Sequence, residues 1–307
     1  MLLLRHRSQR LTSAVSQHRI DGRRVVITGA TSGIGRAAAL ELARRGARLV
    51  IVCRNRAKGE STATEIEQAA PGASVDLVEG DLADLASVRA AAQELRDRYG
   101  SIDVLINNAG VHAVAPRLTN DGFDHMLASN YLGPFLLTNL VLDRVTAAPP
   151  ARVIVVGSEA HRLAGRLHPE RFEDLGDFGL LRSFRAYGRT KLLDILFAAE
   201  LARRLAGTGV TANSLCPGTV VTNLYGQMHG LRAVAPAVSR IPLLRTAEQG
   251  ARMTVRLASD PALDLVSGRY FTSVPGLGLL PPVRARRNAD LQLRIWERTA
   301  ALVELGT

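Results

Sequence analysis

The sequence predicts a single-domain α/β protein of the Rossmann type: a doubly wound parallel sheet of about seven strands with helices on both faces. Short β-branched runs alternate with longer segments rich in alanine and leucine, as in repeated β-α-β units. Most of these runs are continuously apolar, as expected of strands buried on both faces. The first run leads directly into a glycine-rich turn and then into a helix-forming segment. With 307 residues, of which 47% are hydrophobic, the chain has material for one sizeable core.

The expected elements follow one another without an internal repeat or a long linker, so residues 21–307 are expected to form one domain. The irregular stretch at about 220–245 is expected as a substrate-loop insertion beyond the carboxyl end of a strand, where ligands bind in open α/β sheets. The expected strands are Arg24–Thr28, Arg48–Val52, Ser74–Glu79, Val104–Asn107, Val153–Gly157, Thr211–Leu215 and Arg269–Phe271. The helical segments between them include Gly35–Arg45, Leu85–Tyr99, Leu118–Thr146 and Tyr187–Leu205.

The charge distribution bears on partners. The formal net charge is +11, but the arginines are scattered along helical segments and form no block, so no nucleic-acid partner is predicted. Residues 1–20 differ: Met1–Leu4 is apolar and arginines follow it without acidic neighbours. This stretch is too short to span a bilayer and lacks a signal cleavage site. We expect a flexible basic extension, with peripheral contact to a membrane surface as the alternative.

The two cysteines bear on the cellular setting. Cys53 and Cys216 lie in apolar runs without metal-ligand spacing. We therefore expect reduced thiols, a cytoplasmic setting and no metal site.

The glycine-rich turn after the first strand predicts nucleotide binding. Glycines allow the backbone to approach a pyrophosphate, and a helix amino terminus offers unpaired N–H groups and partial positive charge to receive it. The spacing G-x-x-x-G-x-G departs from G-x-G-x-x-G, but the position at the first strand-to-helix junction is the one that dinucleotides use. The residues expected to contact the dinucleotide here are Gly29, Thr31, Ser32, Gly33, Ile34 and Gly35.

The end of the second strand predicts the choice of cofactor. A ribose with a free 2′-hydroxyl calls for an acidic residue there, whereas a 2′-phosphate calls for arginine. This chain has Arg54 and Asn55, and Arg36 in the first helix adds a second positive group. NADP is therefore predicted, with NAD as the alternative. After the third strand, Asp81 and Leu82 are expected near the adenine, although Asp81 could equally cap the next helix.

Tyr187 and Lys191 predict proton-transfer chemistry, because residues at i and i+4 share one helix face. Hydride addition to a carbonyl leaves an alkoxide that needs a proton from a positioned acid. An ammonium about 4 Å from a phenol stabilises the phenolate by roughly 4 kcal/mol at an effective dielectric constant near 20, or about three pKa units. Ser158, after a strand, is expected to hydrogen-bond the substrate oxygen. The alternatives are an exposed helix pair and a serine that only begins a turn.

Several ordered motifs together resemble the classical short-chain dehydrogenase/reductase family, over nearly the whole stretch from Asp21 to Thr307. The chain is most similar to the retinol dehydrogenase-like branch, on softer matches at Cys53-Arg54-Asn55, Gly157–His161 and Ser267–Phe271 and on the long interval between Ser158 and Tyr187. The family motifs are the glycine turn, Asn107–Gly110, Ser129–Gly133, Ser158, Tyr187-x-x-x-Lys191 and Pro217–Thr222.

The resemblance implies further roles. Asn130 is similar to the residue that anchors a water between Lys191 and bulk solvent, and Lys191 would also bind the ribose hydroxyls of the nicotinamide. His161 is interpreted as a residue at the rim of the substrate pocket and not as an acid-base group. Further cofactor contacts are implied for Asn107, Ala109 and Gly110, beside the adenosine half, and for Pro217, Gly218, Val220 and Thr222, around the carboxamide and pyrophosphate.

These features predict an NADP-dependent oxidoreductase that interconverts an alcohol and an aldehyde or ketone. The apolar stretch Leu224–Leu244 favours a lipophilic small molecule. Two alternatives are a non-catalytic NADP-binding sensor of the same fold and a sugar-nucleotide epimerase or dehydratase, which can share Tyr-x-x-x-Lys. The intact serine, tyrosine and lysine argue against the sensor, and the glycine spacing and Asn107–Gly110 argue against the epimerase. The apolar helix face at Leu192–Leu205 could support a homo-oligomer.

Overall fold

Seven strands form one sheet, all parallel, in the order β3-β2-β1-β4-β5-β6-β9. The chain is seen in a computed structural model that describes residues 18–220 and 244–306. All seven predicted strands are confirmed, with small shifts at their ends. They are β1 (Arg24–Thr28), β2 (Arg48–Cys53), β3 (Ser74–Glu79), β4 (Val104–Asn107), β5 (Ala151–Val156), β6 (Val210–Cys216) and β9 (Tyr270–Thr272). A separate pair joins β7 (Thr219–Val220) to β8 (Leu244–Arg245).

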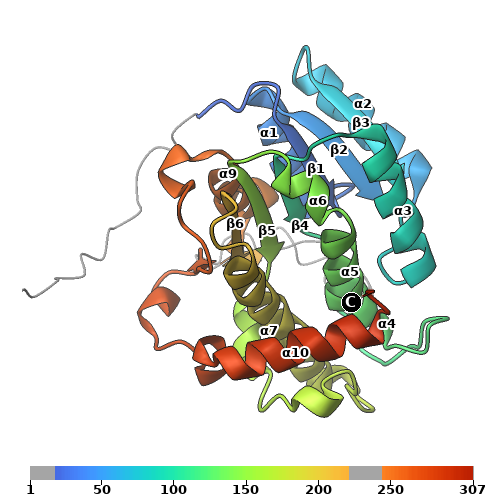
Figure 1. Ribbon diagram of the computed structural model, residues 1–307, viewed down its shortest axis with the longest axis vertical. Coiled ribbons are helices and arrows are strands. Elements are labelled where there is room, and N and C mark those ends of the chain that lie inside the picture. Colours follow the sequence, from blue (N-terminus) through green and yellow to red (C-terminus); the bar gives the residue numbers. More distant parts are fainter. Residues whose placement is uncertain (1–17, 221–243, 307) are drawn as a thin grey trace, which may run out of the picture.

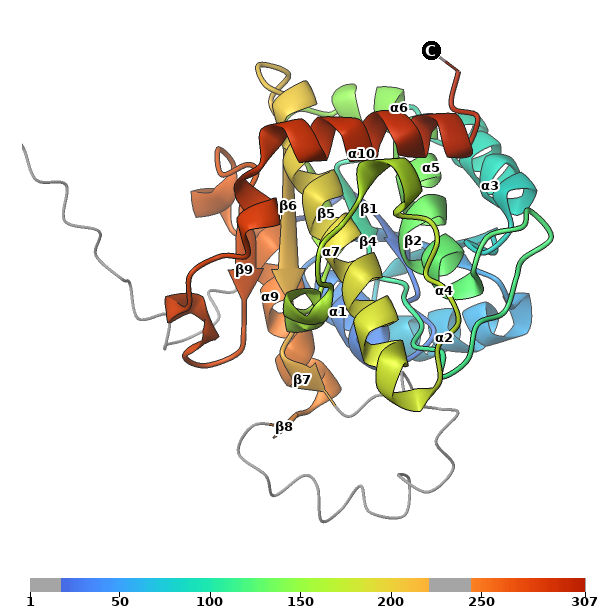
Figure 2. The ribbon, with the colours of Figure 1, turned by 90° about the horizontal axis from the view of Figure 1, so that it is seen from below.

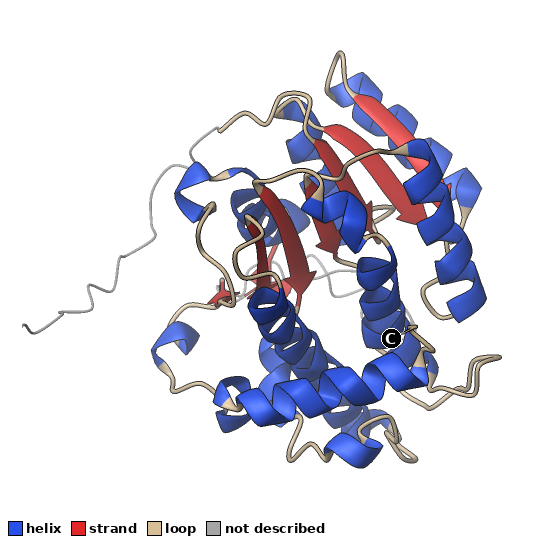
Figure 3. Ribbon diagram, in the orientation of Figure 1, coloured by secondary structure: helices blue, strands red, loops and turns tan. Residues whose placement is uncertain are grey.

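Helices cover both faces of the sheet, as Figures 1 and 3 show, because successive strand residues point to opposite faces. On β1, Val25 and Ile27 join the core under α1, α2 and α9, whereas Val26 joins the core under α3, α5 and α7. The bounds are α1 (Gly33–Arg44), α2 (Arg56–Ala69), α9 (Ala247–Ser259), α3 (Leu85–Arg98), α5 (Gly133–Leu140) and α7 (Leu180–Arg204). The predicted doubly wound α/β fold is therefore confirmed.

Helix α10 (Ala289–Leu302) forms an outer layer that lies across α7 (Figure 2). Its Trp296 ring packs against Phe135 of α5 and Phe197 of α7, with centroids 4.8 and 5.7 Å apart. The short helical pieces are α6 (Leu142–Thr146), η2 (Glu159–Leu163), η3 (Pro169–Arg171), η6 (Pro261–Leu263), η7 (Leu277–Leu279) and η8 (Arg284–Arg287).

The single helix expected at Leu118–Thr146 is wrong. Leu118 instead pairs with Asp124 in an isolated antiparallel bridge. The Asp124 carboxylate accepts from the amides of Met126 and Leu127, so the helix can begin only there. It then runs as α4 (His125–Leu127), the π-helical turn η1 (Ala128–Leu132), α5 and α6.

Helix α7 differs from its expected bounds. It begins at Leu180, seven residues before Tyr187. In the predicted face at Leu192–Leu205, apolar residues such as Leu192, Leu196 and Leu201 are fully buried in the chain's own core. These side chains are therefore used within the chain, and the predicted self-association stays a prediction.

The chain ends and the insertion fall partly outside the described ranges. Residues 1–17 of the expected extension, most of the expected insertion and Thr222 lie outside them. Within the extension, Ile20 is already buried, and its amide donates to Arg45 O at 2.9 Å. Among residues 18–220 and 244–306, no helix has the length and apolar character needed to cross a bilayer.

A buried arginine joins the sheet to the end of α9. Arg152 of β5 is 4% exposed and donates to the carbonyl oxygens of Leu257 and Asp260, the latter at 2.9 Å. Carbonyl groups in the last turn of a helix have no partner within the helix, so this guanidinium supplies one.

We expect Arg152→Met to lower the free energy of unfolding by about 1.5–3 kcal/mol, because buried carbonyls would lose charged donors. Chemical denaturation measures the change. The matched control is Arg48→Met, at an exposed arginine on β2, which should stay within about 0.5 kcal/mol. Equal effects of the two changes would contradict the capping role.

Candidate active site

The carboxyl ends of β1 and β4 lie side by side at the point where the strand order reverses, the position at which open α/β sheets bind ligands. Two positions in the turn after β1, Gly29 and Gly35, have no room for a side chain. A methyl group on Gly29 would lie 2.7 Å from Ala109 Cα, and one on Gly35 would lie 2.3 Å from Gly29 O. Gly29 also has a positive φ of 67°. The close approach of the β1 turn to the β4 loop therefore requires the glycine spacing seen in the sequence.

The amino terminus of α1 suits a bound anion. Ser32 makes no side-chain cap there, and the first turn contains no acidic residue. The first amide to bond back is that of Arg36, which donates to Ser32 O at 3.2 Å. The preceding amides thus remain available, within the described chain, for a ligand such as the pyrophosphate of a dinucleotide. The donors and the shape of this turn fit the cofactor that the sequence predicts.

Asn108 ties the two loops together. Its Nδ2 donates to the carbonyl oxygens of Thr28 and Gly29, both at 3.0 Å. In return, Thr28 Oγ1 accepts from the amides of Asn108 and Ala109, both at 3.1 Å. Sequence reasoning gave Asn108 no role of its own within the motif Asn107–Gly110 and so missed this tie.

The side chain of Asn107 points elsewhere. It is 3% exposed, and its Nδ2 donates to Thr138 Oγ1 of α5 at 2.8 Å. Any contact of Asn107 with the adenosine half would therefore involve its backbone.

The residues predicted to select the cofactor have different surroundings. Arg54 is exposed just after β2, whereas Arg36 forms an ion pair with Glu65 at 2.6 Å, both half exposed. Asn55 caps α2 through its Oδ1, which accepts from Lys58 N at 2.8 Å. Arg54 is thus the more available of the two predicted phosphate ligands.

At the end of β3, Asp81 does not cap the following helix. Its Oδ1 accepts from Ala83 N at 2.9 Å, whereas Asp84 caps α3 by accepting from Ser87 N at 3.0 Å. The alternative role considered for Asp81 therefore belongs to Asp84. Leu82 is buried.

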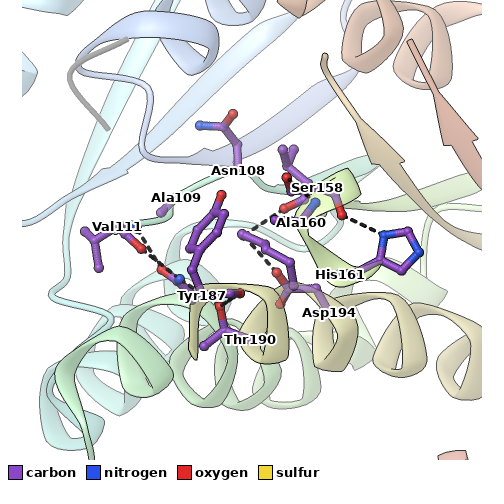
Figure 4. A network of polar contacts seen from close by, with 12 residues as sticks. Asn108, Ala109, Val111, Ser158, Ala160, His161, Tyr187, Thr190 and Asp194 are labelled. Carbon is purple, nitrogen blue, oxygen red and sulfur yellow. Dashed lines mark hydrogen bonds and ion pairs between the residues drawn. The ribbon is translucent and has the colours of Figure 1, made fainter. Parts of the chain in front are cut away.

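Tyr187, Lys191 and Ser158 come together from two elements. Tyr187 and Lys191 lie on the buried side of α7, 8% and 3% exposed, with Lys191 Nζ 5.8 Å from the centre of the tyrosine ring. Ser158 follows β5 after Gly157. Figure 4 shows the Tyr187 ring rising from α7 toward Asn108 and Ala109, with Ser158 beside it. The alternative of an exposed tyrosine-lysine pair is excluded by this burial.

Lys191 is held by partners that its own helix and β5 provide. Its Nζ donates to Val156 O at 3.0 Å and to Asp194 Oδ2 at 2.8 Å. A side chain on Gly110 would begin 3.4 Å from the same nitrogen, so the β4 loop also reaches this point. Burial raises the pKa of Asp194 to about 6, although Lys191 acts to lower it. Sequence reasoning missed Asp194, whose spacing of three residues from Lys191 was the available signal.

Asn130 lies in the π-helical turn, a distortion that is frequent at functional sites. Its Oδ1 accepts from Val111 N at 2.7 Å, and its Nδ2 donates to Val111 O at 2.9 Å and to Thr190 Oγ1 at 3.0 Å. The side chain thereby joins the β4 loop to α7. Its predicted role in anchoring a water stays a prediction.

His161 is not the rim residue that the sequence suggested. It is fully buried, and its Nδ1 lies 2.8 Å from Ser158 O, which assigns the proton to Nδ1 as donor. Burial lowers the pKa of His161. The Ser158 hydroxyl oxygen accepts from Ala160 N at 3.1 Å, so Ser158 also begins the short helix η2. The histidine therefore holds the backbone carbonyl of Ser158 by a hydrogen bond.

The segment after β6 passes beside the glycine turn. Pro217 and Val220 are buried, and the Gly218 amide donates to Cys216 Sγ at 3.4 Å. A side chain on Gly250 would meet both Val220 Cγ2, at 2.7 Å, and Ile34 Cγ1, at 3.2 Å. Among the described residues, no cluster of three or more His, Cys, Asp or Glu side chains could hold a metal.

Comparison with known proteins identifies this arrangement. Residues 23–168 match the model of the short chain dehydrogenase family. Human retinol dehydrogenase 14 is 40% identical over 314 residues, which cover 97% of this chain and 91% of that protein. The chain belongs to the short-chain dehydrogenase/reductase family. Bovine retinol dehydrogenase 12 is 41% identical, over 92% of this chain and 86% of its own length, which supports the retinol dehydrogenase-like branch.

Solved structures similar to this chain agree with the family assignment. An uncharacterised protein from Mycobacterium paratuberculosis aligns with a TM-score of 0.71 and 35% identity, over 94% of this chain and 95% of that one. A protein from Beutenbergia cavernae, described as an NAD(P)-dependent gluconate 5-dehydrogenase and containing NADP, aligns at 0.69 and 31%, over 86% and 100%. The chain is thus an enzyme of the dehydrogenase/reductase class, acting on CH–OH or C=O groups with a nicotinamide cofactor.

We expect Thr28→Val to lower the free energy of unfolding by about 1–3 kcal/mol, because the partly buried amides of Asn108 and Ala109 would lose their acceptor. The substitution nearly preserves volume, so denaturant titration should isolate the lost bonds. Thr64→Val, at an exposed site on α2, is the control. An unchanged midpoint for Thr28→Val would show that the two loops hold together without this hydroxyl.

Proposed function

We propose that the protein is an NADP-dependent oxidoreductase that interconverts an alcohol and an aldehyde or ketone through Ser158, Tyr187 and Lys191. One observation carries the proposal: a buried tyrosine and a buried lysine share one face of α7, and the end of β5 that holds the lysine also leads to the serine. The family supplies the reaction class, and these side chains supply the groups that the chemistry needs.

The division of roles follows from hydrogen-bond capacity. The Ser158 oxygen accepts from Ala160 N, which leaves its own hydrogen to donate to the substrate oxygen. Tyr187 gives a proton to that oxygen during reduction and takes one from it during oxidation. Lys191 stabilises the phenolate form by its charge. Bound nicotinamide supplies or accepts the hydride.

Support for NADP comes from the residues around the end of β2. Arg54 is exposed there. Arg36 lies near the start of α1, where it forms an ion pair with Glu65 at the surface. A 2′-phosphate would compete well for Arg36, because surface ion pairs contribute little free energy. NADP in the Beutenbergia cavernae structure supports a nicotinamide cofactor without deciding between NADP and NAD.

For the substrate we propose a lipophilic carbonyl compound or alcohol. The retinol dehydrogenases among the relatives are named for such a substrate, and the apolar stretch Leu224–Leu244 supports the same class. The setting we propose is cytoplasmic, with peripheral membrane contact as the alternative raised by the basic amino-terminal segment. The homo-oligomer stays a prediction.

We expect Tyr187→Phe to lower kcat for reduction of a lipophilic aldehyde by at least 10²-fold, because a positioned proton donor typically contributes 10²–10⁴-fold. NADPH binding, followed by fluorescence, should remain. Tyr99→Phe, directly after α3, removes a hydroxyl that bonds Asp76 of β3 at 2.7 Å, and should keep full activity. If wild-type protein binds NADPH, turns over no aldehyde, ketone or alcohol, and Tyr187→Phe changes nothing, the sensor alternative gains.

We expect Arg54→Asp to lower the ratio of kcat/KM with NADP to that with NAD by about tenfold or more, equivalent to about 1.4 kcal/mol. An acidic residue repels the 2′-phosphate and can accept a bond from a free 2′-hydroxyl. Arg48→Asp, an exposed arginine at the opposite end of β2, should leave the ratio unchanged. Steady-state kinetics with both cofactors measures this ratio. An unaltered ratio for Arg54→Asp would contradict the NADP assignment.

A further inference from the structure

A buried carboxylate completes a line of three polar side chains on α7. Tyr187, Lys191 and Asp194 fall at i, i+4 and i+7, and a spacing of seven residues returns to the same helix face after two turns. The Lys191 ammonium therefore stands between the phenol and the carboxylate. Both charged side chains of the pair are almost fully buried, at 4% and 2% exposure.

Two of the hydrogen-bond donors of the Lys191 ammonium are already used. An ammonium has three N–H donors. One donates to Val156 O at 3.0 Å and one to Asp194 Oδ2 at 2.8 Å, which leaves one donor toward the phenol and the cofactor side. The carboxylate thus fixes where the ammonium points.

Other titratable groups lie on the elements packed against this stretch of α7. On η1, the Tyr131 hydroxyl bonds Thr299, and burial raises the pKa of that phenol, with a smaller contribution from Asp194. The remaining groups on packed elements are His125 on α4, Arg152 on β5 with Asp264, Glu159, His161 and Arg162 on η2, Cys216 on β6, Arg284, Arg286 and Arg287 on η8, and Asp290, Arg294, Glu297 and Arg298 on α10.

Most of that list is committed away from the pair. Glu159 bonds Arg162 and Tyr270, and Arg286 stacks on the Tyr270 ring at 4.3 Å. Arg294 and Arg298 pair with acidic residues at the surface. The His112 ring also contacts Tyr187, with ring centroids 5.2 Å apart, and burial lowers the pKa of His112 and so favours its neutral form. With that imidazole neutral, the charge beside Tyr187 comes mainly from the lysine and the carboxylate.

We propose that Asp194 is a positioning residue whose carboxylate anchors the Lys191 ammonium and offsets part of the field that this ammonium exerts on Tyr187. The proposal rests on the proposed catalytic role of Tyr187 and Lys191. An unopposed ammonium would favour the phenolate strongly. The Asp194 carboxylate, three residues after Lys191 on the same helix face, opposes the effect of the ammonium. More of the enzyme therefore keeps a neutral Tyr187 phenol at neutral pH. A neutral phenol is the form that can give a proton to a carbonyl oxygen, so Asp194 increases the share of enzyme in the form that reduction uses.

The same geometry makes the offset depend on pH. Burial raises the pKa of Asp194 to about 6, so the carboxylate is charged above that value and becomes neutral below it. The field of Lys191 is therefore opposed in neutral solution and less opposed in mildly acidic solution.

Two substitutions separate charge from anchoring. Asp194→Asn keeps an oxygen that can accept from Lys191 but removes the charge, whereas Asp194→Ala removes both. The matched control is Glu200→Gln, a buried carboxylate on the same helix that pairs with Arg203 and Arg204. The readouts are the ultraviolet difference titration of Tyr187 in cofactor-free protein, obtained by subtracting Tyr187→Phe in each background, and the pH profile of kcat/KM for alcohol oxidation.

We expect Asp194→Asn to move the Tyr187 titration and the rising limb of the oxidation profile to lower pH by about one unit, since one opposing charge is lost at partly screened distance. Glu200→Gln should leave both in place. Asp194→Ala should lower kcat/KM on the order of 10²-fold through loss of position. A titration of Tyr187 that is unchanged or moves to higher pH in a folded Asp194→Asn protein overturns the proposal. If instead the wild type lacks turnover, the proposed function fails, while the titration still tests the offset.

Discussion

The burial of one ammonium group is the constraint on which the site depends. Lys191 is 3% exposed, and a charge removed from water is stable only if the protein replaces the lost hydration. The replacement comes from the Val156 carbonyl at the end of β5 and from the Asp194 carboxylate. Because the first of these belongs to the strand that carries Ser158, the solvation of the lysine also sets the distance between α7 and the serine.

A second constraint is the contact between the turn after β1 and the loop after β4. Gly29 lets the backbones meet, and the bonds between Thr28 and Asn108 hold them. The order of strands places this contact next to β5. The predicted cofactor-binding residues and the proposed catalytic residues therefore lie at the carboxyl ends of neighbouring strands. The cofactor-binding and proton-transfer parts of the site are therefore joined by backbone contacts rather than by flexible side chains.

Much of the fold could be predicted because its signals are local. Continuous apolar runs identified the seven strands, and the glycine turn identified the first junction. The segment Leu118–Thr146 failed because its composition is uniformly helical, while the actual start depends on one capping bond from Asp124 and the interruption on the π-helical turn. Asn107 and Asn108 could not be told apart either. Successive residues of a strand point to opposite faces, but the packing of the strand decides which face each side chain takes.

By itself, the sequence determined the succession of strands along the chain, the glycine turn and the spacing of Tyr187 and Lys191. Each of these depends on residues close together in the chain. The family resemblance rested on the same local motifs. Only the tertiary structure decided that His161 lies buried behind Ser158, that Arg36 is engaged by Glu65, and that the apolar face of α7 is covered by the chain itself. These depend on which distant segments meet, and burial of a polar or apolar group is a property of all its neighbours at once.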